Sequence, residues 1–354
     1  MTDSPSPKLT DLFREAIKRK ASDLHLIAGQ APVFRIDGEL QTFSGSTLTP
    51  ELTKDLSFSM LSPAQARRFE RFRELDFGYA LKGTHRFRLN LRWQQGTVSL
   101  TARLIPMTIP KPEAIGFTET LYQLTHLFDG LILVTGPAGS GKSTTLAAML
   151  DIINTERSAH ILTVEDPIEF VHTAKKSFIE QREVYLDTNS FANGVKYALR
   201  QDPDVILVGE MRDRETMQAA LTAAETGHLV LSTLHTRNAV ESIDRIVDLF
   251  PSHEQHQIRG QLASVLRGVI SQLLLRGRRG GRVAAREILI NNSAVENLIR
   301  DNDERQIYSQ MQMGFREGMR TMNMAIEELR QLRLISDETA KNRKVREMTD
   351  QRYY

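Results

Sequence analysis

One short segment limits what this chain can fold into more than any other feature. Gly136-Pro137-Ala138-Gly139-Ser140-Gly141-Lys142-Ser143 matches the pattern GxxxxGK[ST] at every fixed position. The pattern is informative only between a β-strand and an α-helix, and the apolar run Leu131–Val134 and the helix-prone run Thr144–Leu150 flank it on its two sides. The sequence therefore predicts a phosphate-binding loop rather than a glycine-rich connection without a ligand.

Each residue type in this loop has a physical reason to hold a nucleotide. Glycines let successive backbone N–H groups surround an anion, and the start of the following helix adds partial positive charge. Lys142 can reach the β and γ oxygens, and Ser143 can ligate magnesium. The residues that we expect to bind nucleotide are Gly136, Pro137, Ala138, Gly139, Ser140, Gly141, Lys142, Ser143 and Thr144.

Aliphatic runs recur along the chain after residue 113 and alternate with helical stretches. They lie at 131–134, 161–164, 205–208 and 229–231. Because these runs lack polar alternation, they fit strands that are covered on both faces, which predicts a parallel sheet. From Glu241 onward the periodicity is mainly helical, with one more strand expected at Ala285–Ile290.

The amino-terminal part of the chain has a different pattern. Leu9, Leu12, Phe13 and Ala16 predict a first helix, and alternating segments predict strands, with turns at Asp37-Gly38, Lys82-Gly83 and Gln95-Gly96; these strand segments are 24–27, 32–36, 77–79, 85–93 and 97–105. Prolines 106, 110 and 112 interrupt any helix. We expect a tail at 1–8, an α+β domain at 9–105, a linker at 106–113, a core at 114–290 and a helical region at 291–354.

Acidic and polar side chains follow three of the predicted core strands. Glu165 comes after 161–164, Glu210 comes after 205–208 with Gly209 between, and His235 follows the third strand. Carboxyl ends of parallel strands share one edge of a sheet, so we expect these groups near the loop. Glu210 is the candidate magnesium ligand with Ser143, Glu165 the residue that directs water, and His235 a γ-phosphate sensor. His228 precedes its strand and is expected to be a packed or capping residue.

Composition excludes several other classes. Forty-six Lys and Arg residues against forty-four Asp and Glu give a net charge of +2, so no global field marks a nucleic-acid or membrane binder. Without cysteine the chain has no disulfide framework and no thiolate zinc site. No apolar stretch approaches the roughly 18 residues that a membrane span needs, so we expect neither export nor direct membrane insertion.

Several further segments are similar to those of one family, the secretion and type IV pilus ATPases, and within it to the PilT-like retraction motors. Ala21–Leu26 resembles the first-domain signature of that family, and Thr163–Glu169 resembles its Asp box. The other similar segments are Gln181–Val184, Leu199–Asp204, Gly209–Asp213 and Ala224–Thr236, the last resembling its His box. The resemblance covers nearly the whole chain.

This resemblance implies an α/β chain with a RecA-like P-loop ATPase core, a smaller amino-terminal α+β domain that is PAS-like, and a helical carboxy-terminal region. It also implies ATP and Mg²⁺ as cofactors, a homo-hexamer, and Arg88 and Arg103 as the basic residues that reach the phosphates, whereas Arg86 and Arg92 are expected to point outward. The implied partner is an inner-membrane pilus platform protein. The implied location is cytoplasmic, at the inner face of the membrane through the pilus machinery.

Two departures bear on the direction of movement. Many retraction motors carry Ala-Ile-Arg before an Asn-Leu pair, whereas this chain has Ala294-Val295-Glu296-Asn297-Leu298. Glu296 therefore weakens retraction as an assignment without affecting ATP turnover, and it leaves an accessory or regulatory pilus ATPase open. Extension motors usually carry an extra amino-terminal domain and a four-cysteine zinc insertion, which the absence of cysteine and the short stretch before the linker disfavour.

A nucleic-acid motor is the remaining alternative. Its local support is the arginine cluster within Arg276–Arg282. The cluster contains no aromatic residue on which a base could stack, and glycines and arginines between a helix and a strand are typical of a solvated turn. We therefore expect no nucleic-acid partner.

Overall fold

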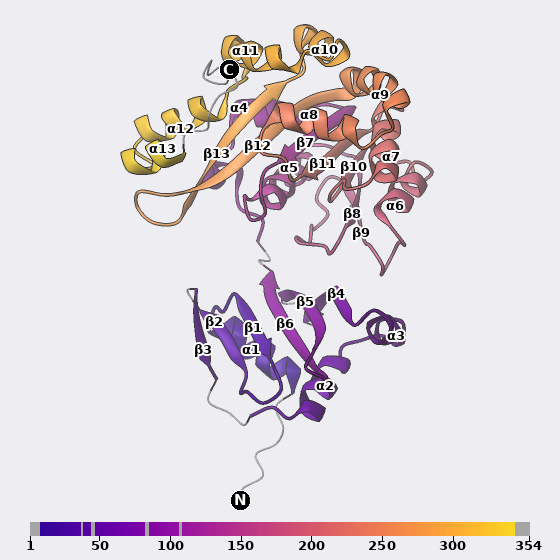
Figure 1. Cartoon of the computed structure of the whole chain (residues 1–354), viewed down its shortest axis with the longest axis vertical. Helices are drawn as coiled ribbons and strands as arrows, with labels where there is room; N and C mark the ends of the chain where they lie inside the picture. Colours follow the sequence, from indigo (N-terminus) through magenta and orange to yellow (C-terminus); the bar gives the residue numbers. More distant parts are fainter. Residues whose placement is uncertain (1–7, 37, 44–46, 82–84, 106–107, 344–354) are drawn as a thin grey trace, which may run out of the picture. The chain divides into compact units, whose positions relative to one another are not determined.

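The computed structural model describes residues 8–36, 38–43, 47–81, 85–105 and 108–343. The chain forms two compact units (Figure 1). The first contains the described residues up to Thr108 together with Pro167–Val171, and the second contains Ile109–Asp166 and the chain from His172 onward. The predicted turn at Lys82-Gly83, Asp37 of the first predicted turn, Pro106 and all but the last residue of the predicted tail lie outside the described residues.

The first unit is built on an antiparallel sheet of six strands in the order β3-β2-β1-β6-β5-β4. The strands are β1 Asp23–Leu26, β2 Val33–Ile36, β3 Glu39–Thr42, β4 Glu74–Leu81, β5 His85–Gln94 and β6 Thr97–Ile105. Its helices are α1 Leu9–Lys18, α2 Pro50–Phe58 and α3 Pro63–Phe72. The predicted first helix and the turn at Gln95-Gly96 are confirmed.

Alternation along the strands gives this sheet one apolar and one polar face. Phe87, Leu89 and Leu91 of β5 are fully buried, whereas the residues between them are only partly buried. The apolar face packs against α1, where the ring of Phe13 stacks on that of Phe87 with centroids 4.3 Å apart. Because side chains alternate with a period of two, Arg86, Arg88 and Arg92 share the opposite face.

The second unit contains a seven-stranded sheet in the order β13-β12-β7-β11-β10-β8-β9. All neighbouring pairs run parallel except β12 and β13. Its strands are β7 Gly130–Thr135, β8 His160–Glu165, β9 Phe178–Glu183, β10 Val205–Val208, β11 Leu229–Leu234, β12 Leu266–Arg276 and β13 Arg282–Ile290. The predicted parallel sheet is therefore confirmed.

Helices cover both faces of this sheet (Figure 1). They are η1 Pro112–Ile115, α4 Glu119–Thr125, α5 Lys142–Glu156, α6 Phe191–Ala198, α7 Arg214–Glu225, α8 Ala239–Asp248, α9 Ser252–Val265, α10 Ser293–Arg300, α11 Glu304–Met313, η2 Gly314–Glu317, α12 Met322–Gln331 and α13 Asp337–Arg343.

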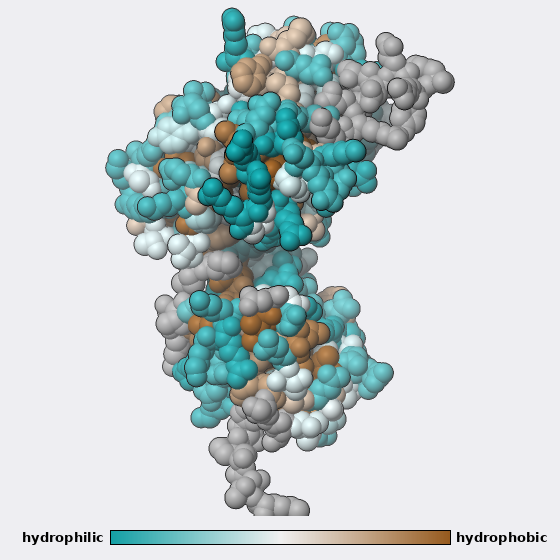
Figure 2. Space-filling model, turned by 90° about the vertical axis from the view of Figure 1, so that its left-hand side faces the viewer, coloured by the Kyte–Doolittle hydropathy of each residue, from teal (hydrophilic) through white to brown (hydrophobic). Residues whose placement is uncertain are grey.

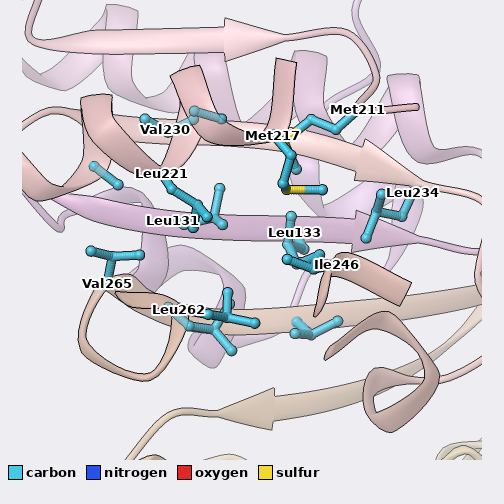
Figure 3. Close-up of a cluster of buried hydrophobic side chains, with 14 of the residues drawn as sticks. Leu131, Leu133, Met211, Met217, Leu221, Val230, Leu234, Ile246, Leu262 and Val265 are labelled. Atoms are coloured by element: carbon cyan, nitrogen blue, oxygen red, sulfur yellow. The ribbon is translucent and has the colours of Figure 1, made fainter. Parts of the chain in front are cut away.

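Alternate residues of β7 belong to separate hydrophobic clusters on the two sides of the sheet. Leu131 and Leu133 pack with the helices from α6 to α11, and Figure 3 shows them beside Leu221 and Met217 of α7. Ile132 and Val134 pack with α4 and α5 instead. This arrangement explains why the strand has no polar alternation, since both of its faces are buried.

Several elements were not predicted from the sequence. The expectation of mainly helical structure after Glu241 is wrong for Leu266–Arg276, which forms β12 directly after α9. The glycine and arginine cluster consequently lies between two strands, in the turn of the hairpin β12–β13, and not between a helix and a strand. Strands β3 and β9 and the two helices α2 and α3 were also not predicted.

A buried carboxylate of β13 joins two helices of the second unit. One oxygen of Glu287 accepts a hydrogen bond from the N–H of Ala239, the first residue of α8, at 2.8 Å. The other accepts from the N–H of Met322, the first residue of α12, at 3.2 Å. Negative charge at the start of a helix is favourable, because the first N–H groups lack partners within the helix.

Candidate functional site: a phosphate loop and the ends of three strands

The predicted loop is formed between β7 and α5. Gly136, Gly139 and Gly141 all have positive φ angles, of 138°, 74° and 90°. A Cβ atom at Gly136 would lie 2.4 Å from the backbone oxygen of Gln272, so only glycine fits there. Residues 137–139 are exposed at the tip of the loop, and α5 begins at Lys142 with no side chain capping its first N–H groups. These groups can therefore bind an anion.

The backbone of the loop holds the ammonium of Lys142 in place, and it leaves the hydroxyl of Ser140 without a partner among the described residues. The ammonium of Lys142 donates to the carbonyl oxygens of Gly136 at 2.8 Å and Pro137 at 3.1 Å. Its side chain is almost fully buried, so the positive charge lies inside the loop. The buried hydroxyl of Ser140 has no hydrogen-bond partner among the described residues. A buried polar atom without a partner in such a loop fits a site that a phosphate would complete.

Strand β12 supports the loop from the side. Gln272 is buried, its amide donates to the carbonyl oxygen of Ser140 at 2.7 Å, and its own oxygen accepts from the hydroxyl of Thr145 at 2.9 Å. The neighbouring Ser271 hydroxyl lies 2.7 Å from that of Thr135. Gln272 is not among the predicted site residues because the sequence predicts helical structure in this region. A polar Ser-Gln pair within an apolar run was the available signal.

Glu165 is the last residue of β8 and is 9% exposed. One of its carboxylate oxygens accepts hydrogen bonds from the hydroxyl of Thr163 at 2.8 Å and from the amide of Gln181, on β9, at 3.1 Å. The carboxylate is therefore oriented by two neighbours from adjacent strands. Gln181 belongs to a segment that the family resemblance singled out, although no role was predicted for it.

Glu210 and His235 lie together beyond the ends of β10 and β11. Nε2 of His235 is 3.5 Å from a carboxylate oxygen of Glu210, and Nε of Arg212 is 2.7 Å from the same oxygen. Glu210 is largely shielded, with a side chain that is 16% exposed, whereas Arg212 is open to solvent. The structure thus brings two of the predicted site residues into contact.

The backbone at these strand ends is closely packed around Gly209. A Cβ atom at Gly209 would lie 3.3 Å from the backbone oxygen of Val164 and 3.4 Å from Cα of Glu165. The N–H of Gly209 donates to that oxygen of Val164, and the hydroxyl of Thr233 donates to the oxygen of Gly209. The first acidic residue after β10 is therefore Glu210.

Sheet topology gathers these groups at one edge. Strands β7, β11, β10 and β8 are consecutive neighbours and all run parallel, so their carboxyl ends coincide. The phosphate loop, His235, Glu210 and Glu165 follow these four ends in that order. Ligands of open α/β sheets bind outside the carboxyl ends of the strands. The arrangement is therefore suited to bind a phosphorylated ligand and to act on its terminal phosphate.

Arg88 and Arg103 lie on the polar face of the sheet in the first unit, directly opposite each other on β5 and β6. Arg103 is paired with the buried Asp23 of β1 at 2.8 Å. Burial raises the pKa of Asp23, but hydrogen bonds from Arg103 and Ser22 outweigh this and leave the pKa below its usual value. Arg92 donates to side chains of its own sheet, as expected for a structural arginine.

Two other residues that the sequence singled out have partners close by in the chain. Nδ1 of His228 lies 3.0 Å from the backbone oxygen of Ala223, at the end of α7, and so His228 is a capping residue as expected. Glu296 lies on α10 and forms an ion pair with Arg300 one turn later, at 2.6 Å.

No helix within the described residues has the length and apolar character to cross a membrane.

Comparison with known proteins identifies the class to which this fold and site belong. A family model described as "Type II/IV secretion system protein" matches residues 3–335, and the chain belongs to that family. Among its relatives, the type IV pilus retraction ATPase PilT of Pseudomonas aeruginosa is 46% identical over 95% of this chain and 97% of that protein. The type IV pilus ATPase PilU of the same organism is 36% identical over 90% of this chain and 84% of that protein.

Solved structures agree with this assignment. A crystal structure of the pilus retraction motor PilT with bound ADP has a TM-score of 0.88 at 48% identity and covers 95% of this chain and 96% of that chain. The ATPase DotB of Legionella pneumophila has a TM-score of 0.86 at 29% identity, with 97% of each chain covered. The predicted fold class and the predicted resemblance to PilT-like ATPases are both confirmed.

Proposed function

We propose that this chain is an ATPase motor of a type IV pilus that couples Mg²⁺-dependent ATP hydrolysis to pilus retraction and twitching motility. The supporting observation is a complete phosphate loop, with Glu165, Glu210 and His235 at the same edge of the sheet, in a chain 46% identical to PilT over 95% of its length. The motor would act as a homo-hexamer at the inner face of the cell membrane, on an inner-membrane platform protein.

The chemistry assigned to each residue follows from its position. The loop residues 136–144, through the backbone N–H groups of all of them except Pro137, and the ammonium of Lys142 bind the phosphates and offset their charge. Glu165, held by Thr163 and Gln181, orients the attacking water and accepts its proton. His235, which contacts Glu210, is the proposed sensor of the γ-phosphate.

Magnesium fits this donor set. Mg²⁺ usually takes one or two protein oxygens together with phosphate oxygens and water. The hydroxyl of Ser143 and the carboxylate of Glu210 are the residues that would hold it. When bound, the ion would offset the negative charge that develops on the phosphate during hydrolysis. Arg88 and Arg103 are the proposed groups that stabilise the leaving phosphate, and Arg103 would first have to leave Asp23.

Lys142→Ala tests the proposal at the level of both chemistry and movement. Removing the ammonium from the loop should abolish ATP turnover by the purified protein, and the variant gene should fail to restore retraction of labelled pili in a deletion strain. A matched control is Lys196→Ala, an exposed lysine of α6 in the same unit. Normal turnover by Lys142→Ala would refute the assigned site, and full turnover without any pilus defect on deletion would refute the assigned process.

A second candidate function is that of an accessory or regulatory pilus ATPase. The observation that favours it is the residue at position 296. Many retraction motors carry a basic arginine there, whereas this chain has the acidic Glu296, which forms an ion pair with Arg300 on the same helix. Steady-state turnover of the assembled protein separates the two, because a regulator would bind ATP and hydrolyse little of it. Retraction that persists in the deletion strain with reduced force or frequency would also favour the accessory role.

A further inference from the structure

The turn of the hairpin β12–β13 carries a concentrated positive charge that the proposed ATPase site does not use. Arg276, Arg278, Arg279 and Arg282 are all exposed, and none of them forms an ion pair within the part of the chain that the structure describes. Arg276 and Arg282 are direct cross-strand partners. Like charges opposite each other on two strands are destabilising, so this turn maintains its charge at a cost in folding stability.

A second loop adds a fifth arginine and two apolar side chains to the same place. The backbone N–H of Arg278 donates to the oxygen of Leu334 at 2.8 Å, which fixes the hairpin turn against the loop between α12 and α13. Arg333 in that loop is exposed and has a positive φ of 56°. Leu332 and Leu334 on either side of it are 60% and 44% exposed. We call these five arginines and two leucines the cationic tip.

The cationic tip is held rigidly by the packing beneath it. Leu275 and Ala285 on the two arms of the hairpin are buried against Ile326 of α12 and Ala340 of α13. Figure 2 shows strongly hydrophilic side chains, with hydrophobic ones between them, over the side of the molecule where the hairpin, α12 and α13 lie. A fixed group of arginines with aliphatic side chains among them is suited to a surface that is anionic outside and apolar beneath.

We propose that the cationic tip binds directly to the surface of a membrane that contains anionic lipids. Guanidinium groups pair with lipid phosphates in a bidentate manner, and an anionic membrane surface attracts clustered basic residues. The exposed leucines enter the boundary between headgroups and acyl chains. A nucleic acid fits less well, because residues 276–282 and 332–334 contain no aromatic side chain on which a base could stack. The inference does not depend on ATP turnover.

Vesicle flotation of the full-length protein tests the proposal. The protein should float with vesicles of phosphatidylcholine and phosphatidylglycerol, and not with vesicles of phosphatidylcholine alone. Each arginine near an anionic surface contributes roughly fivefold to partitioning, so the variant Arg278→Gln/Arg279→Gln/Arg282→Gln should bind about a hundredfold more weakly. Leu332→Ser/Leu334→Ser should keep the preference for anionic vesicles but dissociate at lower salt, because it loses the apolar contribution.

A matched control removes the same charge elsewhere in the second unit. Arg245, Arg305 and Arg316 are exposed and form no ion pair within the described residues, so replacing all three with Gln should leave flotation unchanged. Equal loss in the control and in the tip variant would overturn the proposal in favour of a general charge effect, as would equal binding to neutral vesicles. Tighter binding to duplex DNA, lost in the tip variant, would overturn it in favour of a nucleic-acid partner. An unchanged midpoint of urea unfolding in every variant establishes that the folded state is intact.

Discussion

Glu165 is the residue for which position and chemistry can be separated most clearly. Glu165→Gln keeps the shape and an oxygen that Thr163 and Gln181 can bond, but it removes the base. We expect kcat to fall by about 10² to 10⁴ while ATP binding changes little. Steady-state turnover and equilibrium nucleotide binding measure the two effects.

A nearby carboxylate provides the control for Glu165. Glu180→Gln, on the adjacent strand β9, removes a carboxylate that is 41% exposed. Its contact with Nε2 of His160, at 4.0 Å, is long and therefore weak. We expect normal turnover from this variant. Equal losses in binding and turnover for Glu165→Gln would instead make Glu165 a ligand-binding residue.

The ion pair of Asp23 with Arg103 predicts that the stability of the first unit depends on pH. Its folded-state pKa is depressed, so its contribution to stability is present above the unfolded value of about 3.9 and is lost as the pH falls through the folded-state pKa. Since Arg103 is largely exposed, the contribution is about 1 kcal/mol or less.

Urea unfolding of Asp23→Asn measures this contribution. The variant should be less stable than the wild type at neutral pH, and the difference should vanish in strong acid. Glu39→Gln, at an exposed position of β3, is the control and should be neutral throughout. A difference that persisted undiminished in acid would mean that Asp23 acts through packing and not through its charge.

At the scale of elements, β12 determines the shape of the phosphate loop although it contributes nothing to the sequence motif. Gln272→Ala removes the bonds to Ser140 and Thr145, and we expect a loss of about 1 to 3 kcal/mol in nucleotide binding. Because Gln272 acts by positioning, KM should change more than kcat. The exposed Gln331→Ala is the control. A fall in kcat with KM unchanged would contradict a supporting role.

The elements that could be predicted from the sequence are those whose burial makes their residues almost entirely aliphatic. Strands β7, β8, β10 and β11 are aliphatic because both of their faces are covered, and this pattern can be recognised in the sequence alone. Strand β12 escaped prediction because it continues from α9 without a breaking residue. In contrast, α2 and α3 had readable signals, since Thr49-Pro50 and Ser62-Pro63 begin them and Gln65 completes a capping box with Ser62.

The site was predictable to a similar degree. Glu165, Glu210 and His235 follow strands that the sequence identifies, and parallel strands bring such residues to one edge. Partners from distant segments were not predictable. The contacts of Glu165 with Gln181 and of the loop with Gln272 depend on β9 and β12 being neighbours of the other strands. Strand order is set by packing over the whole sheet and leaves no local pattern.

On the scale of the whole molecule, the two units have separate hydrophobic cores. Phe87 is buried in the core of the first unit, and Leu221 is buried in the core of the second (Figure 3). We expect calorimetry to resolve two unfolding transitions. Phe87→Ala should lower the free energy of unfolding of the first unit by about 3 to 5 kcal/mol and so reduce the midpoint temperature of only one transition. Leu221→Ala should lower that of the second unit by about 2 to 5 kcal/mol and reduce the midpoint of only the other. A single transition lowered by both substitutions would mean that the units unfold together.

The carboxylate of Glu287 has a mechanical consequence for this molecule. It is bonded at once to the first residue of α12 and to the first residue of α8, and α8 begins four positions after His235. Pulling α12 away would take one backbone hydrogen bond from a buried carboxylate that is also bonded to the start of α8. Any force that reaches the last helices of the chain is therefore transmitted to the segment that contains His235, and the reverse holds for any rearrangement that starts there.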